Sequence, residues 1–187
     1  MDSVPSNIRM GAVGLLVDHQ LTTLQEQSLE FDEPFLEPFD PELVQPTSVD
    51  LRLDINFRRL NWDGVEVAKW SEKKEAYRYR VPPLGFRLAN TMEIVHLPSI
   101  CAGRVEGKST FGRKGLLTHS QAGFVDPGFK GQITLELFNA TDQDIWLECG
   151  KPIVQLCVWA LHSRPARTYG EAGNHYQDQR GPTPAAY

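Results

Sequence analysis

The segment from Cys101 to Asn139 holds the residue types that a phosphate site requires. Glycine recurs through it, and a glycine-rich backbone turns tightly and approaches a bound ligand closely. A cluster of cations and hydroxyls lies in its first half, at Arg104, Lys108, Ser109, Thr110, Arg113 and Lys114. Cations, hydroxyls and backbone N–H groups together form a cradle for phosphate oxygens. The segment therefore predicts that the protein binds a phosphorylated ligand.

Two carboxylates in the same segment are candidates for proton transfer. Asp126 lies in the turn VDPGF, and Glu136 lies in the apolar run ITLELF at residues 133–138. If this run is a strand, Thr134, Glu136 and Phe138 share one face. A carboxylate among apolar neighbours is a candidate general base.

The remainder of the chain must form the scaffold for these residues. Alternating apolar and polar residues predict a strand over 48–57, with Val49, Leu51, Leu53 and Ile55 on one face. The further predicted strands cover 65–70, 76–81, 85–88, 94–97, 103–105, 133–138, 145–147 and 153–161. Pro, Gly and Asn-Asp turns separate them at short intervals, which is typical of an antiparallel sandwich or barrel. We expect a mainly β fold with few helices.

The ends of the chain differ from this pattern. Residues 18–27 predict a short helix with Asp18 as its N-cap. The proline-rich stretch at 31–46 predicts an extended segment without regular structure. We expect one β domain over 1–162, with a loose lead-in at 1–13, followed by a flexible tail or lid at 163–187, which is too poor in large aliphatic residues to build a core.

Composition excludes several classes of protein. A net charge of -5 argues against a dedicated nucleic-acid binder, which usually has a basic face. The 3 cysteines have no C-x-x-C spacing, so neither a disulfide framework nor a zinc knuckle is predicted. The apolar run GAVGLLV lacks a cleavage site and is too short to cross a membrane. A cytoplasmic location, without membrane partners, is the expectation.

Three familiar motifs are incomplete. GKST at 107–110 lacks the earlier glycine of a Walker A loop, because position 102 is alanine, and no convincing helix is predicted after it. No histidine is followed two residues later by glutamate, as zinc deaminases require. No G-x-S-x-G nucleophile elbow is present.

The residues do resemble one family. GRVEGKSTFGRKGLLTHSQAGFVDPGFKGQITLELFN is similar to the central region of dCTP deaminases, which share a trimeric β fold with the dUTPases. The resemblance extends to QPTSVDLRL, PPLGFRLANTMEIVHLP, GKPIVQL and YGEAGNHYQDQRGPTP, and so covers about residues 14–184. The core looks closest to bifunctional members, which carry Ala-Gly-Phe or Ala-Gly-Trp where this chain has Ala122-Gly123-Phe124. The fold implied is the dUTPase-like distorted jelly roll or β-barrel.

The resemblance implies a zinc-independent hydrolytic deamination of dCTP to dUTP and ammonia. Glu136 matches the family's general base, and Ser109 and Arg113 match the pair that positions the attacking water. Asp126 matches the residue that binds the sugar 3′-hydroxyl, and Phe129 matches the aromatic packed on the sugar.

The other nucleotide contacts are also implied by the resemblance. Peptide groups around Ala122 and Phe124, and from Thr134 through Leu135 to Glu136, would read the base edge. The residues expected at the triphosphate are Lys108, Thr110, Gln155, Tyr169, His175 and Gln179. Mg²⁺ would be held mainly by phosphate oxygens, so no protein metal ligand is expected. A homotrimer with shared active sites is also implied.

Alternatives stay open at this point. A bifunctional enzyme would carry dCTP through to dUMP and pyrophosphate, using Asp126 or a neighbouring carboxylate for a second water. A pure dUTPase is disfavoured because dUTPases have an apolar residue at the position of Glu136. A nucleotide-binding protein without turnover is a further alternative. Three departures from the family pattern, Lys108 for arginine, Gln121 for threonine and His175 for lysine, bear on affinity and substrate choice.

Overall fold

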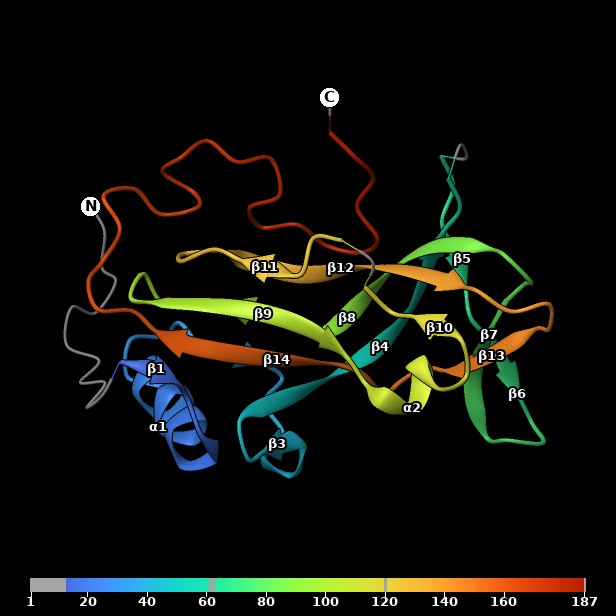
Figure 1. The fold of residues 1–187 in the computed structure, drawn as a ribbon, viewed down its shortest axis with the longest axis horizontal. Coiled ribbons are helices and arrows are strands. Elements are labelled where there is room, and N and C mark those ends of the chain that lie inside the picture. Colours follow the sequence, from blue (N-terminus) through green and yellow to red (C-terminus); the bar gives the residue numbers. More distant parts are fainter. Residues whose placement is uncertain (1–12, 61–62, 120, 187) are drawn as a thin grey trace.

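The computed structural model describes residues 13–60, 63–119 and 121–186. Within these residues the strands form a large curled sheet and a small one (Figure 1). Neighbours along the large sheet are, in order, β10 (Leu116–Leu117), β12 (Lys130–Asn139), β8 (Phe86–His96), β4 (Ser48–Arg58), β14 (Pro152–Ala160), β9 (Cys101–Gly107) and β11 (Phe124–Val125). The predicted mainly β fold is confirmed.

Short elements complete the two sheets. Four two-residue strands pair at the sides of the large sheet: β1 (Gly14–Leu15), β2 (Leu36–Glu37), β3 (Val44–Gln45) and β5 (Glu66–Val67). The small sheet has the order β13 (Ile145–Glu148), β7 (Ala76–Val81), β6 (Lys69–Ser71). The helices described are α1 (Asp18–Leu29), the 3₁₀ turn η1 (Pro41–Leu43) and the four-residue α2 (Ser109–Gly112).

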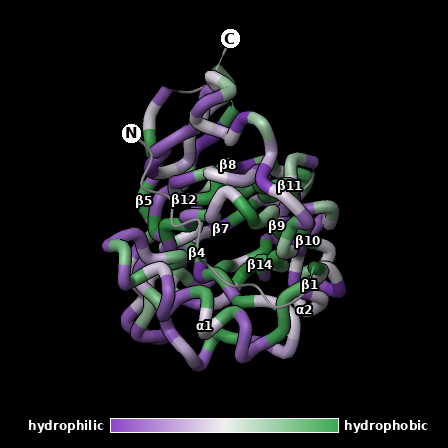
Figure 2. The backbone as a smooth tube through the Cα atoms, turned by 90° about the vertical axis from the view of Figure 1, so that its left-hand side faces the viewer, coloured by the Kyte–Doolittle hydropathy of each residue, from purple (hydrophilic) through white to green (hydrophobic). Residues whose placement is uncertain are grey.

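The core follows the alternation seen in the sequence. Val49, Leu51 and Leu53 of β4 are at most 2% exposed, and Leu135 and Leu137 of β12 are fully buried. Figure 2 shows the same separation, with hydrophobic residues concentrated along the strands and hydrophilic ones in the outer loops. Because successive side chains of a strand point to opposite faces, burial of Leu135 and Leu137 turns Glu136 to the other face of β12.

Several predicted boundaries were wrong. The strands expected at 85–88 and 94–97 are one continuous strand, β8, and the strand expected at 65–70 is divided between β5 and β6. The proline-rich stretch contains β2, η1 and β3, because its prolines fall beside short pairings rather than within long ones.

The predicted helix ends also differ from the structure. Helix α1 is N-capped by Val17, whose backbone N–H donates to Gln20 Oε1 at 3.0 Å, so Asp18 is inside the helix. A short helix, α2, does follow Lys108. Most of the predicted lead-in lies outside the described residues.

A buried polar network explains why β8 is continuous. Asn90, Thr91 and Glu93 look like a break in an apolar strand, yet each is at most 2% exposed. Asn90 Nδ2 donates to Asp54 Oδ2 of β4 at 2.8 Å, and the Nε and backbone N–H of Arg52 donate to the Glu93 carboxylate at 2.6 and 2.8 Å. Burial raises the pKa of Glu93, and the bonds from Arg52 oppose that rise.

We expect Arg52→Ala to destabilise the protein by about 3 kcal/mol, because it leaves a buried carboxylate unpaired. A carboxyl with a raised folded-state pKa binds its proton more readily when folded, so stability falls as pH rises through that pKa. The stability lost in Arg52→Ala should therefore be smaller near about pH 5 than near about pH 8. Chemical denaturation at both pH values measures it.

Arg80→Ala is the matched control, because its ion pair with Asp144 at 3.1 Å is largely solvent-exposed. That change should cost less than about 1 kcal/mol, with little pH dependence. Equal losses in the two variants would contradict the importance assigned to the buried pair.

The tail after β14 runs across β11 and β12 (Figure 1). Gly131 of β12 forms a parallel bridge with Gln179, and the Gln179 side chain donates to the Gln132 carbonyl at 2.7 Å. Gly131 has φ +151°, and a Cβ there would lie 3.1 Å from the backbone of Gln179, so glycine is needed for this close approach. The domain division at residue 162 stays a prediction.

Candidate active site

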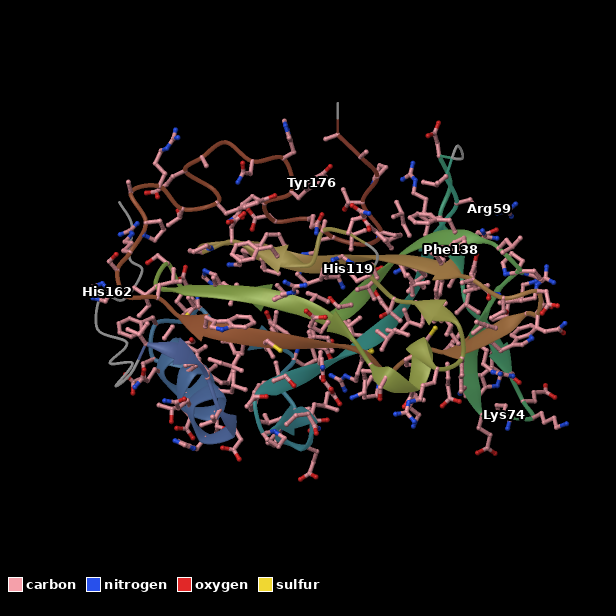
Figure 3. The ribbon with its side chains drawn as sticks, in the orientation of Figure 1. Arg59, Lys74, His119, Phe138, His162 and Tyr176 are labelled. Carbon is pink, nitrogen blue, oxygen red and sulfur yellow. The ribbon has the colours of Figure 1, made fainter. Side chains whose placement is uncertain are left out.

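A cavity of about 430 Å³ lies where the tail crosses β12. Its walls come from the end of β4, from β8 and β12, from the segment 119–129, and from the tail. The lining residues are Leu60, Phe86, Leu88, His119, Ala122, Phe124, Val125, Asp126, Phe129, Ile133, Thr134, Glu136, Tyr169, Tyr176, Gln179, Thr183, Pro184 and Ala185. Two of them are labelled in Figure 3: His119, from the segment after β10, and Tyr176, from the tail.

Glu136 projects from β12 into this cavity and is half-buried. The backbone N–H of Gln121 donates to its Oε2 at 3.1 Å. A hydrogen bond of this kind helps to fix the direction of the carboxylate within the cavity. The arrangement therefore suits a positioned general base.

The cavity wall at 126–129 carries a second carboxylate beside an aromatic pair. Asp126 lines the cavity and is solvent-exposed, whereas Phe129 is 5% exposed. The rings of Phe129 and Tyr169 meet edge to face with centroids 5.4 Å apart. Burial raises the pKa of Tyr169, so its hydroxyl stays protonated and can donate a hydrogen bond.

The tail closes the cavity through contacts with β12. The Gly181 backbone N–H donates to Gln132 Oε1 at 2.7 Å, and that of Thr183 donates to Thr134 Oγ1 at 3.3 Å. Gln179, Thr183 and their neighbours thereby become part of the cavity wall.

A second group of predicted site residues lies outside the wall of this cavity. Lys108 precedes α2, and its ammonium group forms an ion pair with Asp50 of β4. Asp50 is 4% exposed, and its buried Oδ1 has no hydrogen-bond partner within residues 13–60, 63–119 and 121–186. Gln155 of β14 lies opposite Asp50 in the strand register. This group combines a cation, a carboxylate and an amide beside the exposed hydroxyls of α2.

The predicted residues thus fall into two sets. Those that line the cavity are Glu136, Ala122, Phe124, Asp126, Phe129, Thr134, Tyr169 and Gln179. Those outside its wall are Lys108, Ser109, Thr110, Arg113, Leu135, Gln155 and His175. Leu135 contributes its side chain to the core, and His175 is an exposed tail residue. The single chain does not bring Ser109 and Arg113 to the cavity that contains Glu136.

Sequence reasoning missed several residues of the cavity and its surroundings. Among the described residues, no hydrogen-bond partner contacts either buried ring nitrogen of His119, although His119 lies only a few residues from the singled-out glycines. Leu60, Phe86 and Leu88 form an apolar wall, and nothing local in the sequence places them there, since strand register alone decides it. The sequence indicates the Asp50–Lys108 ion pair only weakly. Asp50 is a carboxylate that alternates with core residues in a predicted strand.

Two observations bear on metals and membranes. Within residues 13–60, 63–119 and 121–186, no group of three or more His, Cys, Asp or Glu side chains is arranged to hold a metal ion. No helix in the described part of the chain is long and apolar enough to cross a membrane.

Comparisons with known proteins show which family the chain resembles. A family profile described as dCTP deaminase-like matches residues 15–161. The chain is 46% identical over 162 residues to "dCTP deaminase, dUMP-forming" of Salinispora tropica, covering 80% of this chain and 84% of that protein. It is 48% identical over 162 residues to the protein of the same name from Mycolicibacterium smegmatis, covering 80% of this chain and 86% of the relative.

A solved structure supports the fold. The crystal structure of 2′-deoxycytidine 5′-triphosphate deaminase from Agrobacterium tumefaciens is similar with a TM-score of 0.63 at 20% identity. The similarity covers 81% of this chain and 49% of that one, so the present chain spans about half the length of the solved protein.

Proposed function

Because the chain belongs to the dCTP deaminase-like family, we propose that it converts dCTP to dUMP, ammonia and pyrophosphate. The observation that carries the proposal is one cavity lined by both Glu136 and Asp126, a carboxylate for each hydrolytic step. The dUMP-forming names of the relatives favour this bifunctional reaction over the dUTP product that was the main prediction from the sequence.

The first step is hydrolytic deamination. Glu136 takes a proton from a water that adds to C4 of the cytosine ring, and returns it toward N3 and the departing amine. The C4–N4 bond breaks, ammonia leaves, and dUTP remains in the cavity. General base catalysis of this kind contributes roughly 10²–10⁴-fold in rate. The Gln121 N–H supports the role by holding the carboxylate in a fixed direction.

The second step is hydrolysis at the α-phosphorus. Asp126 activates a second water, the bond between the α-phosphorus and the bridging oxygen breaks, and pyrophosphate leaves. Asp126 also accepts a hydrogen bond from the sugar 3′-hydroxyl, with Phe129 packed on the sugar. The position of both residues on one wall of the cavity supports this assignment.

We further propose a homotrimer whose subunits share active sites. In one chain, Ser109 and Arg113 lie outside the wall that contains Glu136. A neighbouring copy would supply them, together with Lys108, Thr110 and Gln155, to the open side of the cavity. Cyclic symmetry then completes every site in the same way. His175 and Gln179 of the tail contribute to triphosphate binding, and the tail acts as a lid.

Mg²⁺ fits the proposed triphosphate site. The unpartnered Oδ1 of Asp50 is a hard oxygen donor beside Lys108, of the kind that Mg²⁺ accepts in addition to phosphate oxygens. The bound ion would neutralise charge on the triphosphate. A cytoplasmic location and the absence of nucleic-acid and membrane partners are part of the same proposal.

A dual product assay tests the function. Purified protein incubated with dCTP should release ammonia and pyrophosphate in equal amounts, with dUMP as the nucleotide product. Ammonia with dUTP, and no pyrophosphate, would reject the second step and restore the monofunctional deaminase. Pyrophosphate from dUTP but no ammonia from dCTP would indicate a dUTPase. Binding of dCTP without either product would leave only a nucleotide-binding protein.

A further inference from the structure

The two sides of Glu136 differ in chemistry. In the large sheet, β12 lies between β8 and β10, so Glu136 has a β8 side and a side facing the segment that follows β10. On the β8 side, Leu88 lies directly opposite Glu136 in the strand register. Residues directly opposite in an antiparallel pair share a face and have adjacent side chains. Leu60 and Phe86 continue this wall, and we call Leu60, Phe86 and Leu88 the apolar wall.

The opposite side of Glu136 is polar. Here the Gln121 N–H donates to the Glu136 carboxylate, and Ala122 and Phe124 line the cavity. His119 adds two buried ring nitrogens that have no hydrogen-bond partner within the described part of the chain. Buried polar groups without partners are costly, so a ligand with hydrogen-bonding atoms is favoured on this side.

A cytosine ring has the same asymmetry. Its N3 and O2 atoms form a hydrogen-bonding edge, whereas C5 and C6 carry only C–H groups. Complementarity places the N3 edge toward the segment 119–124 and the C5 edge toward the apolar wall. Since C5 is bonded to C4, a base positioned for attack at C4 beside Glu136 has its C5 atom next to Leu88.

We propose that the apolar wall admits a methyl group at C5, and that the protein also deaminates 5-methyl-dCTP. This inference rests on the proposed deamination of dCTP. Water adds at C4, the C4–N4 bond breaks and ammonia leaves, as for dCTP, so no oxidant or reductant is required. The product is a thymidine nucleotide in place of a deoxyuridine nucleotide, which makes the protein an enzyme for removing methylated cytosine nucleotides from the precursor pool.

The wall has room to adjust to the methyl group. Leu60 is 56% exposed at the rim, so it can shift into solvent without opening a core cavity. A pocket of purely hydrophobic contacts discriminates weakly between ligands that differ by one methyl group, typically by about 10–200-fold. Because the methyl group meets apolar side chains here, we expect the discrimination between dCTP and 5-methyl-dCTP to lie at the lower end of that range.

The test compares dCTP and 5-methyl-dCTP with the same purified protein. Ammonia release gives kcat/KM for each, and chromatography identifies the nucleotide product. We expect kcat/KM for 5-methyl-dCTP within about tenfold of that for dCTP. Turnover of dCTP with no detectable turnover of 5-methyl-dCTP would overturn the inference. No ammonia from either substrate would instead reject the proposed deamination itself.

Two variants locate the methyl group. Leu88→Phe should lower kcat/KM for 5-methyl-dCTP at least about tenfold more than for dCTP, because the larger ring fills the space beside C5. Leu60→Phe, at an exposed position that folding tolerates, should act in the same direction. Leu29→Phe on α1, outside the cavity and 57% exposed, is the matched control and should leave the ratio unchanged. Equal losses for both substrates in both wall variants would overturn the placement of C5 at this wall.

Discussion

Replacing Glu136 by glutamine should abolish ammonia release from dCTP while leaving dCTP binding within severalfold. The amide has the shape of the carboxylate and keeps an oxygen that can accept the Gln121 N–H bond, which is 3.1 Å long in the native chain. It cannot take a proton from water. We therefore expect kcat to fall by roughly 10²–10⁴-fold or more, with little change in Kd.

The measurement is a steady-state ammonia assay beside a calorimetric titration with dCTP. Glu148→Gln is a suitable control, because Glu148 is a half-buried glutamate of β13, outside the cavity wall, whose ion pair with Lys151 is 3.9 Å long. Normal activity is expected there. Deamination retained in Glu136→Gln would remove the proposed role of this residue.

Two inactive variants should restore activity when they assemble together. Arg113→Ala damages the set of residues around α2, and Glu136→Gln damages the cavity set, so each homotrimer alone is expected to be inactive. In mixed trimers some sites combine an intact Glu136 from one subunit with an intact Arg113 from another. Co-expression in equal amounts should recover about a quarter of the native activity, by random assortment within a cyclic assembly.

This result depends on sites that span two subunits. Mixing the purified homotrimers without subunit exchange should give no recovery, which separates assembly from simple addition. No recovery after co-expression, or a fully active monomer in solution, would show that Ser109 and Arg113 act within their own chain or not at all.

Much of the fold could be predicted from alternation of apolar and polar residues. That pattern located β4, β7 and β12, since each has one buried face and one more polar face. It failed at β8, where Asn90, Thr91 and Glu93 are buried. The partners of Asn90 and Glu93, which are Asp54 and Arg52, lie about 40 residues earlier in the chain. Local patterning cannot reveal that buried polar residues are satisfied by a distant strand.

The parts of the candidate site that lie close together in the sequence were predictable. The parts that are placed by the pairing of distant strands were not. The segment 122–136 carries Asp126, Phe129 and Glu136 in one glycine-rich run, and the structure puts all three on one cavity. The apolar wall comes from β8 and the end of β4, whose positions are set by long-range strand pairing. The tail contacts depend on Gly131 and Gln179, which are far apart in sequence and adjacent in the structure.

The course of the tail has a practical consequence for protein production. Pro184 and Ala185 line the cavity, and the backbone N–H of Ala186 donates to the Tyr176 hydroxyl at 3.2 Å. An affinity tag attached to this tail would therefore follow directly on the cavity wall and compete with nucleotides for the cavity. A cleavable tag at the amino end is the safer design for kinetic work.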